Sequence, residues 1–141
     1  MKSGRGVITG LGATAAAVSL LAFGAGPAVA GPVSESVVSY DSPKHGWASA
    51  QAYVSVDGVF LDVCDGGDPD GRRAVGYLYF GSTKVMTAQA TGGSGSCSPP
   101  RTSLGWSRGA GWFTVMACTR DGADGRDQGC NSWPFYFDGE L

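Results

Sequence analysis

Apolar and polar residues alternate over short stretches of the chain, and this pattern predicts β-strands. Two such stretches, 47–56 and 59–63, flank the pair Asp57-Gly58. Asp-Gly tolerates the positive φ angles that a two-residue hairpin turn needs, so these stretches are expected to pair as a hairpin. On the first strand Ala50, Ala52 and Val54 would share one face, because successive side chains point to opposite sides of a sheet.

Four later segments also alternate, and no segment shows a helical period. They are residues 72–80, 83–90, 112–119 and 133–137. Loops rich in Gly, Ser, Pro or Asp separate most of them, and such residues favour turns. Regularly spaced short strands predict an all-β protein: a small antiparallel β-sandwich or barrel-like domain.

Residues 31–46 precede the first predicted strand and are interpreted as an extended N-terminal arm. Four apolar side chains, Val33, Val37, Val38 and Tyr40, lie on this segment. A segment without a binding role is more often plainly polar, so these side chains are candidates for contact with a partner protein. The alternative left open is an edge strand that pairs with its own domain.

The first thirty residues have the features of a secretory signal peptide. Lys2 and Arg5 precede an uncharged stretch, residues 7–29, and Ala28-Val29-Ala30 fits a cleavage site. Glycines and a proline interrupt the stretch, which argues against a membrane anchor. The sequence therefore predicts a secreted, extracellular protein, with a signal peptide at 1–30, the arm at 31–46 and one β domain at 47–141.

Composition narrows the functional classes. The chain has 141 residues, of which 24 are Gly, and Gly disfavours helix interiors. Without residues 1–30 it keeps eight basic and twelve acidic side chains, a net charge of −4. An acidic domain of this kind is not expected to bind nucleic acid or a membrane surface.

Four cysteines, Cys64, Cys97, Cys118 and Cys130, lie after the predicted signal peptide. An even count in a small exported chain predicts two disulfides. No two cysteines have the spacing of a zinc motif, so neither a metal nor a cofactor is expected. Three pairings are possible, and Cys64–Cys97 with Cys118–Cys130 is favoured because it closes the shorter loops.

No recognisable catalytic pattern is present, and a non-enzymatic role is expected. Ser107 lies in a G-x-S-x-G sequence, but a predicted strand follows it where a nucleophile elbow needs a helix. The single histidine, His45, precedes this serine, whereas the triad order places it after.

The loop after Cys64 carries Asp65, Asp68 and Asp70 but does not fit an EF-hand, which requires a carboxylate at its twelfth position. Solvated turn aspartates are favoured. A looser calcium site that uses this loop and the acidic loop near residue 124 is the alternative left open.

Four tryptophans are many for a domain of this size. Trp106 lies at the end of a long Gly/Ser/Pro loop and is the candidate for exposure and partner binding. Trp112 and Trp133 are expected to fill the core.

The hairpin, the Val63-Cys64-Asp65 step and Cys130-Asn131-Ser132-Trp133 give the chain a resemblance to small two-disulfide exported β-proteins of Streptomyces type. Among these it most resembles the adaptor subunit of umbrella toxin particles, over residues 31–137. The resemblance implies an arm that inserts into an adhesin-like subunit and a body that sits on a large repeat-containing toxin. The expected function is a secreted protein–protein adaptor in bacterial competition.

Two other functions stay open at this point. A protease inhibitor could act through the loop from Cys97 to Arg101, where a disulfide and two prolines would hold an exposed arginine in place. An enzyme or a carbohydrate-binding module could use Trp106 together with the acidic loops.

Overall fold

The computed structural model describes residues 31–40, 46–67, 69–99 and 102–139. The predicted signal peptide, His45, Asp68 and Arg101 fall outside these ranges. Within them the chain forms strands, turns and loops, with no helix. Consequently no described segment is a helix long and apolar enough to span a bilayer.

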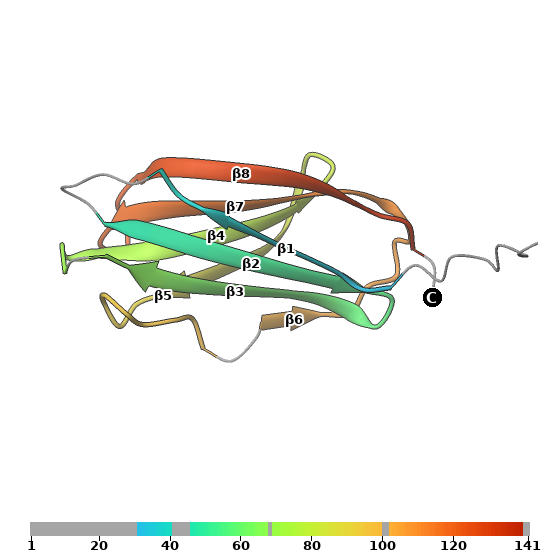
Figure 1. Ribbon diagram of the computed structural model, residues 1–141, viewed down its shortest axis with the longest axis horizontal. Coiled ribbons are helices and arrows are strands. Elements are labelled where there is room, and N and C mark those ends of the chain that lie inside the picture. Colours follow the sequence, from blue (N-terminus) through green and yellow to red (C-terminus); the bar gives the residue numbers. More distant parts are fainter. Residues whose placement is uncertain (1–30, 41–45, 68, 100–101, 140–141) are drawn as a thin grey trace, which may run out of the picture.

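Eight strands form two antiparallel sheets, which lie against each other as two layers (Figure 1). The strands are β1 (Val33–Val38), β2 (Trp47–Ser55), β3 (Gly58–Gly66), β4 (Arg72–Phe80), β5 (Thr83–Ala90), β6 (Thr102–Leu104), β7 (Gly111–Asp121) and β8 (Asp127–Phe137). One sheet has the order β1-β2-β3-β6 and the other β5-β4-β7-β8. The predicted all-β, sandwich-like fold is confirmed.

The expected hairpin between β2 and β3 is present, with its turn one residue earlier than predicted. Ser55 pairs with Gly58, so Val56 and Asp57 form the two-residue turn. The Ser55 hydroxyl donates a hydrogen bond to the Gly58 carbonyl at 3.2 Å, which closes the hairpin.

The core lies between the two sheets and follows the alternation read from the sequence. On β2, Ala50, Ala52 and Val54 are buried, as expected. At the centre the sheets approach closely at Gly76, where an added Cβ would lie 2.3 Å from Val63 Cγ2. A residue without a side chain is therefore required here, because packed interiors have no room for an additional carbon.

The N-terminal arm is corrected by the structure: residues 33–38 are extended, but they form the edge strand β1 of the first sheet. Each residue of β1 has a partner on β2, from Val33 opposite Val54 to Val38 opposite Ser49. Val37 is 7% exposed and belongs to the core. The physical reason is the alternation within the segment, which gives it an apolar face that the sandwich can bury.

Both predicted disulfides are confirmed. Cys64–Cys97 joins the end of β3 to the loop that precedes β6, and Cys118–Cys130 joins β7 to β8. Each bridge thus ties a strand to a segment beside it, which limits the freedom of the unfolded chain.

Candidate functional site

The outer face of the β5-β4-β7-β8 sheet carries a concentration of aromatic side chains. Along β7 the buried residues Phe113 and Val115 point between the sheets, so Trp112 and Met116 point outward. Residues that lie opposite each other on antiparallel strands share a face. Three opposing pairs therefore occupy the outer face: Trp112 with Tyr136, Tyr79 with Thr114, and Tyr77 with Met116.

Trp112 and Tyr136 are large, exposed aromatic side chains on this face, and we call them the aromatic pair. Their side chains are 60% and 50% exposed, and their ring centroids lie 5.4 Å apart at 63°. Next to them Thr114 lies opposite Pro134, so the neighbouring row is also uncharged. Single exposed apolar residues are common on protein surfaces, whereas two large exposed rings in contact form a contiguous apolar patch. Such patches mark binding sites more often than isolated exposed residues do.

A small second core lies on this outer face itself, apart from the main core between the sheets. Val75, Tyr77 and Cys118 are buried there, and Tyr79, Met116 and Cys130 pack against them. The Cys118–Cys130 disulfide lies within this cluster and fastens β8 to β7. The two strands that carry the aromatic pair are therefore covalently linked to each other.

Three polar side chains from three strands join beside this cluster. The Tyr77 hydroxyl donates to Asp127 Oδ2 at 2.5 Å and accepts a hydrogen bond from Arg120 Nη2 at 2.6 Å. Arg120 also pairs with Asp127 Oδ1, through Nε at 2.8 Å and Nη2 at 2.7 Å. The Lys84 ammonium lies 5.1 Å from the centre of the Tyr77 ring.

These contacts fix the protonation of the network. Burial, and then the hydrogen bond to Asp127, raise the pKa of Tyr77 to about 12. Burial alone would raise the pKa of Asp127, but hydrogen bonds from Arg120 and Tyr77 outweigh it and lower that pKa. At neutral pH Tyr77 keeps its proton and Asp127 is ionised and paired, an arrangement that locks strands together rather than one that moves protons.

The tryptophan assignments made from the sequence are wrong for all three residues. Trp106 is 9% exposed; it packs 4.9 Å from the rings of both Phe80 and Phe113, and its Nε1 donates to the Gly109 carbonyl at 2.9 Å. It therefore offers no surface to a partner. Trp112 and Trp133 are 60% and 54% exposed instead of buried.

The N-terminal candidate residues do not form one patch with Trp106. Val33 packs at the margin of the core and Val37 lies within it. Val38 and Tyr40 remain 49% and 67% exposed. The main chain at both is tied to β8, because Asn131 Nδ2 donates to the Val38 carbonyl at 3.0 Å and Tyr40 N donates to the Gly129 carbonyl at 2.8 Å.

The remaining sequence candidates gain no catalytic context. Ser107 is exposed in the loop between β6 and β7, and the strand β7 follows it. His45 and Arg101 lie outside the described residues, so the structure tests neither the expectation that no triad forms nor the alternative of a protease inhibitor. Among the described residues, no three or more His, Cys, Asp or Glu side chains gather as a metal-binding group would require.

Comparison with known proteins gives no match to a family model, to a curated protein or to a solved structure.

Proposed function

We propose that the protein is an exported, non-enzymatic protein-binding domain that recognises a partner protein through the aromatic pair, Trp112 and Tyr136. The observation that carries the proposal is the exposure of these two rings on a sheet face whose strands a disulfide and a polar network link together. Trp, Tyr and Met are the residues that protein interfaces favour at their centres, where charged residues are depleted. Thr114 and Pro134 continue this uncharged surface across the two strands.

The geometry of the rings favours a protein over a polysaccharide. Trp112 and Tyr136 meet at 63°, so their faces do not form one flat platform on which successive sugar rings could stack. Rings at such an angle present an uneven apolar surface instead, against which a partner side chain can pack.

The finer form of the proposal is an adaptor in an extracellular toxin complex, which joins an adhesin-like subunit to a large repeat-containing toxin. It rests on the resemblance to the umbrella toxin adaptor. The two disulfides are typical of proteins in oxidising compartments. Residues 33–38 belong to the sheet and do not form a free arm. We therefore assign the contact with the adhesin-like subunit to the outer face of the β5-β4-β7-β8 sheet instead of to the arm.

The test is capture of the partner from culture supernatant by the mature protein, followed by a binding titration with the identified partner. Trp112→Ala and Tyr136→Ala should each weaken binding by about 30-fold or more, as expected for a hot-spot residue. The matched control is Trp133→Ala, which removes an equally large exposed ring from the other side of β8.

Three results would contradict the proposal. Unchanged binding by both variants would exclude the aromatic pair. Loss of binding only in Trp133→Ala would move the contact to the edge of the sandwich. A partner that is a secreted protease, inhibited in a manner that Arg101→Ala abolishes, would establish the inhibitor function instead.

A further inference from the structure

The outer face that carries the aromatic pair is positively charged, although the chain as a whole is acidic. Alternation along the strands directs four charged side chains outward on this face: Arg73 of β4, Lys84 of β5, Arg120 of β7 and Asp127 of β8. Three positive charges and one negative charge give the face a net charge of +2. Residues 31–141 together carry −4, so the rest of the chain is more acidic still.

Lys84 and Arg73 supply this positive charge, because Arg120 and Asp127 neutralise each other. Arg120 pairs with Asp127 Oδ1 through Nη2 at 2.7 Å and Nε at 2.8 Å. Arg73 Nη1 donates to the uncharged side chain of Gln89 at 3.2 Å. No described acidic residue lies within ion-pair distance of Lys84 or Arg73, so both charges remain available to a partner.

Lys84 places its charge beside the apolar part of the face. The side chain is exposed, and its ammonium lies 5.1 Å from the centre of the Tyr77 ring. Lys84 shares a row with Tyr79 and Thr114, and Trp112 lies two residues before Thr114 on the same side of β7. Two strand spacings across the sheet and one side-chain repeat along it separate the main chain at Lys84 and Trp112 by roughly 12 Å. One interface of about 800 Å² per partner therefore covers both residues.

The outer face of the other sheet offers no such combination. There Gln51 lies opposite Asp62, Tyr53 lies opposite Phe60, and β1 adds Ser36 beside Gln51. Its described strands direct one charged side chain outward, the acidic Asp62. Attraction between opposite charges therefore directs an acidic partner to the face of the aromatic pair and a basic partner elsewhere.

We propose that the aromatic pair binds an acidic segment of its partner protein, in which an apolar side chain packs on Trp112 and Tyr136 and a neighbouring carboxylate pairs with Lys84. This inference rests on the proposed function and names the chemistry of its partner. The apolar contact supplies most of the affinity, since pairs of exposed charges contribute little. Lys84 instead selects the partner, because it attracts a carboxylate and repels a basic segment that offers the same apolar side chain.

Peptide selection tests this chemistry before the partner is identified. The probe is a library of short random peptides displayed on phage and selected on the immobilised mature protein at about 0.1 M salt. Enriched peptides should combine a large apolar residue with Asp or Glu and should be depleted of Lys and Arg. Selection on Lys84→Glu should remove the preference for acidic residues, and selection on Trp112→Ala should recover none of these peptides.

Titration with a synthetic copy of the most enriched peptide measures the contribution of Lys84. Lys84→Glu should weaken binding by about tenfold or more at about 0.1 M salt, and the effect should shrink at about 0.5 M, where charges are screened. Lys84→Arg should keep the affinity within about twofold, since it retains the charge. A thermal melt of each variant verifies that it is folded.

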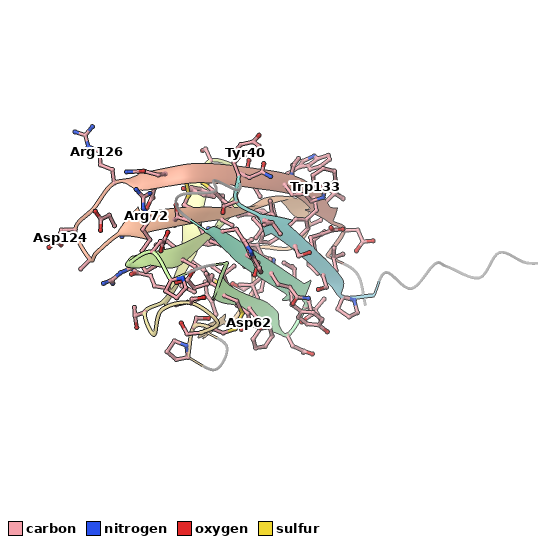
Figure 2. All side chains as sticks on the ribbon, turned by 60° about the vertical axis from the view of Figure 1, so that its left-hand side comes forward. Tyr40, Asp62, Arg72, Asp124, Arg126 and Trp133 are labelled. Atoms are coloured by element: carbon pink, nitrogen blue, oxygen red, sulfur yellow. A yellow bond between two sulfur atoms is a disulfide. The ribbon has the colours of Figure 1, made fainter. Side chains whose placement is uncertain are left out.

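The matched control is Arg126→Glu, which makes the same change of charge at the β7–β8 turn. Arg126 is exposed, and Figure 2 shows it with Asp124 at one end of the molecule and Trp133 toward the other end. Roughly 30 Å of extended strand separates Arg126 from Tyr136, about three times the screening length at 0.1 M salt. This variant should therefore change the affinity by less than about twofold.

The outcomes that overturn this inference differ from the one that contradicts the proposed function. Peptides that need Trp112 but have no acidic bias, with affinity unchanged in Lys84→Glu, would overturn the acidic segment and leave the aromatic pair as a binding site. Peptides that still bind Trp112→Ala would contradict the proposed function, and this inference with it. Absence of any enriched peptide would overturn the inference as well. A homodimer in sedimentation that Trp112→Ala dissociates would assign the face to a second copy of the chain instead.

Discussion

The Tyr77 hydroxyl donates a 2.5 Å hydrogen bond to the carboxylate of Asp127, fifty residues away in sequence. This contact joins β4 to β8 across the intervening strand β7, whose Arg120 bonds to both partners. Burial of the phenol, and then this hydrogen bond, raise the pKa of Tyr77 and give the protein a pH-dependent stability.

We predict that the protein loses stability between pH 10 and 12 through Tyr77. The unfolded chain releases the phenolic proton near the ordinary pKa of 10.0, whereas the folded protein holds it to about 12. The stabilisation is thus complete below pH 10 and disappears as the pH rises through the folded pKa. A shift of this size corresponds to about 2–3 kcal/mol.

Denaturant unfolding at several pH values measures this loss. Tyr77→Phe should flatten the alkaline part of the curve, while Tyr79→Phe, on the same strand and face, should leave the loss due to Tyr77 in place. An identical alkaline profile for Tyr77→Phe and the unsubstituted protein would contradict the assignment.

Substitution of Gly76 should destabilise the centre of the sandwich. In Gly76→Ala the new methyl group would meet Val63 Cγ2 at 2.3 Å and Ala50 Cβ at 3.2 Å. Relief of such contacts forces the sheets apart and typically costs about 1–3 kcal/mol. Gly105→Ala is the control, because nothing lies within 4 Å of its added Cβ. Chemical denaturation of both variants decides the point, and equal stability would show that the sheets separate without strain.

Trp106 is buried and Trp112 is exposed, the reverse of what the sequence predicted. Their substitutions should therefore have opposite effects on stability and binding. Trp106→Ala should lower the free energy of unfolding by about 3–5 kcal/mol, since it empties a site between Phe80 and Phe113. Trp112→Ala should change it by less than about 1 kcal/mol, since its ring is largely in solvent. Thermal melts of the two variants test this, and a strongly destabilised Trp112→Ala would mean that its ring is part of the core.

Removal of residues 31–38 should destabilise the isolated protein, because β1 belongs to the sheet. Burial of the Val37 side chain alone contributes roughly 1.5–3 kcal/mol, and the paired main chain of β2 becomes an exposed edge. Amide exchange offers a check without mutation: the β1 amides that bond to β2 should be protected in the monomer. Fast exchange throughout 33–38 would restore the free-arm hypothesis.

The aromatic pair could be found in part from the sequence. On β7, Trp112 is out of phase with Phe113, Val115 and Ala117, which form the inward stripe. That phase places Trp112 on the outer side of its strand. The density of tryptophan in the chain favoured the core instead, and the local alternation was the better guide.

Alternation by itself determined the strands, their faces and the all-β class, because these depend only on the period of side chains along an extended chain. The even number of cysteines and the shorter loops indicated both disulfides. These are local or nearly local properties, and β4 and β5 begin and end at the predicted residues.

Only the tertiary structure decided which faces are covered. Trp133 is in phase with the buried Phe135 and Phe137, yet it is 54% exposed, because the part of the chain that covers those two rings does not extend over Trp133. The pairing of β1 with β2 and the short strand β6 likewise depend on an available neighbouring edge. The phase of a residue fixes the side of its strand, whereas burial requires another part of the chain on that side, and no local pattern encodes that.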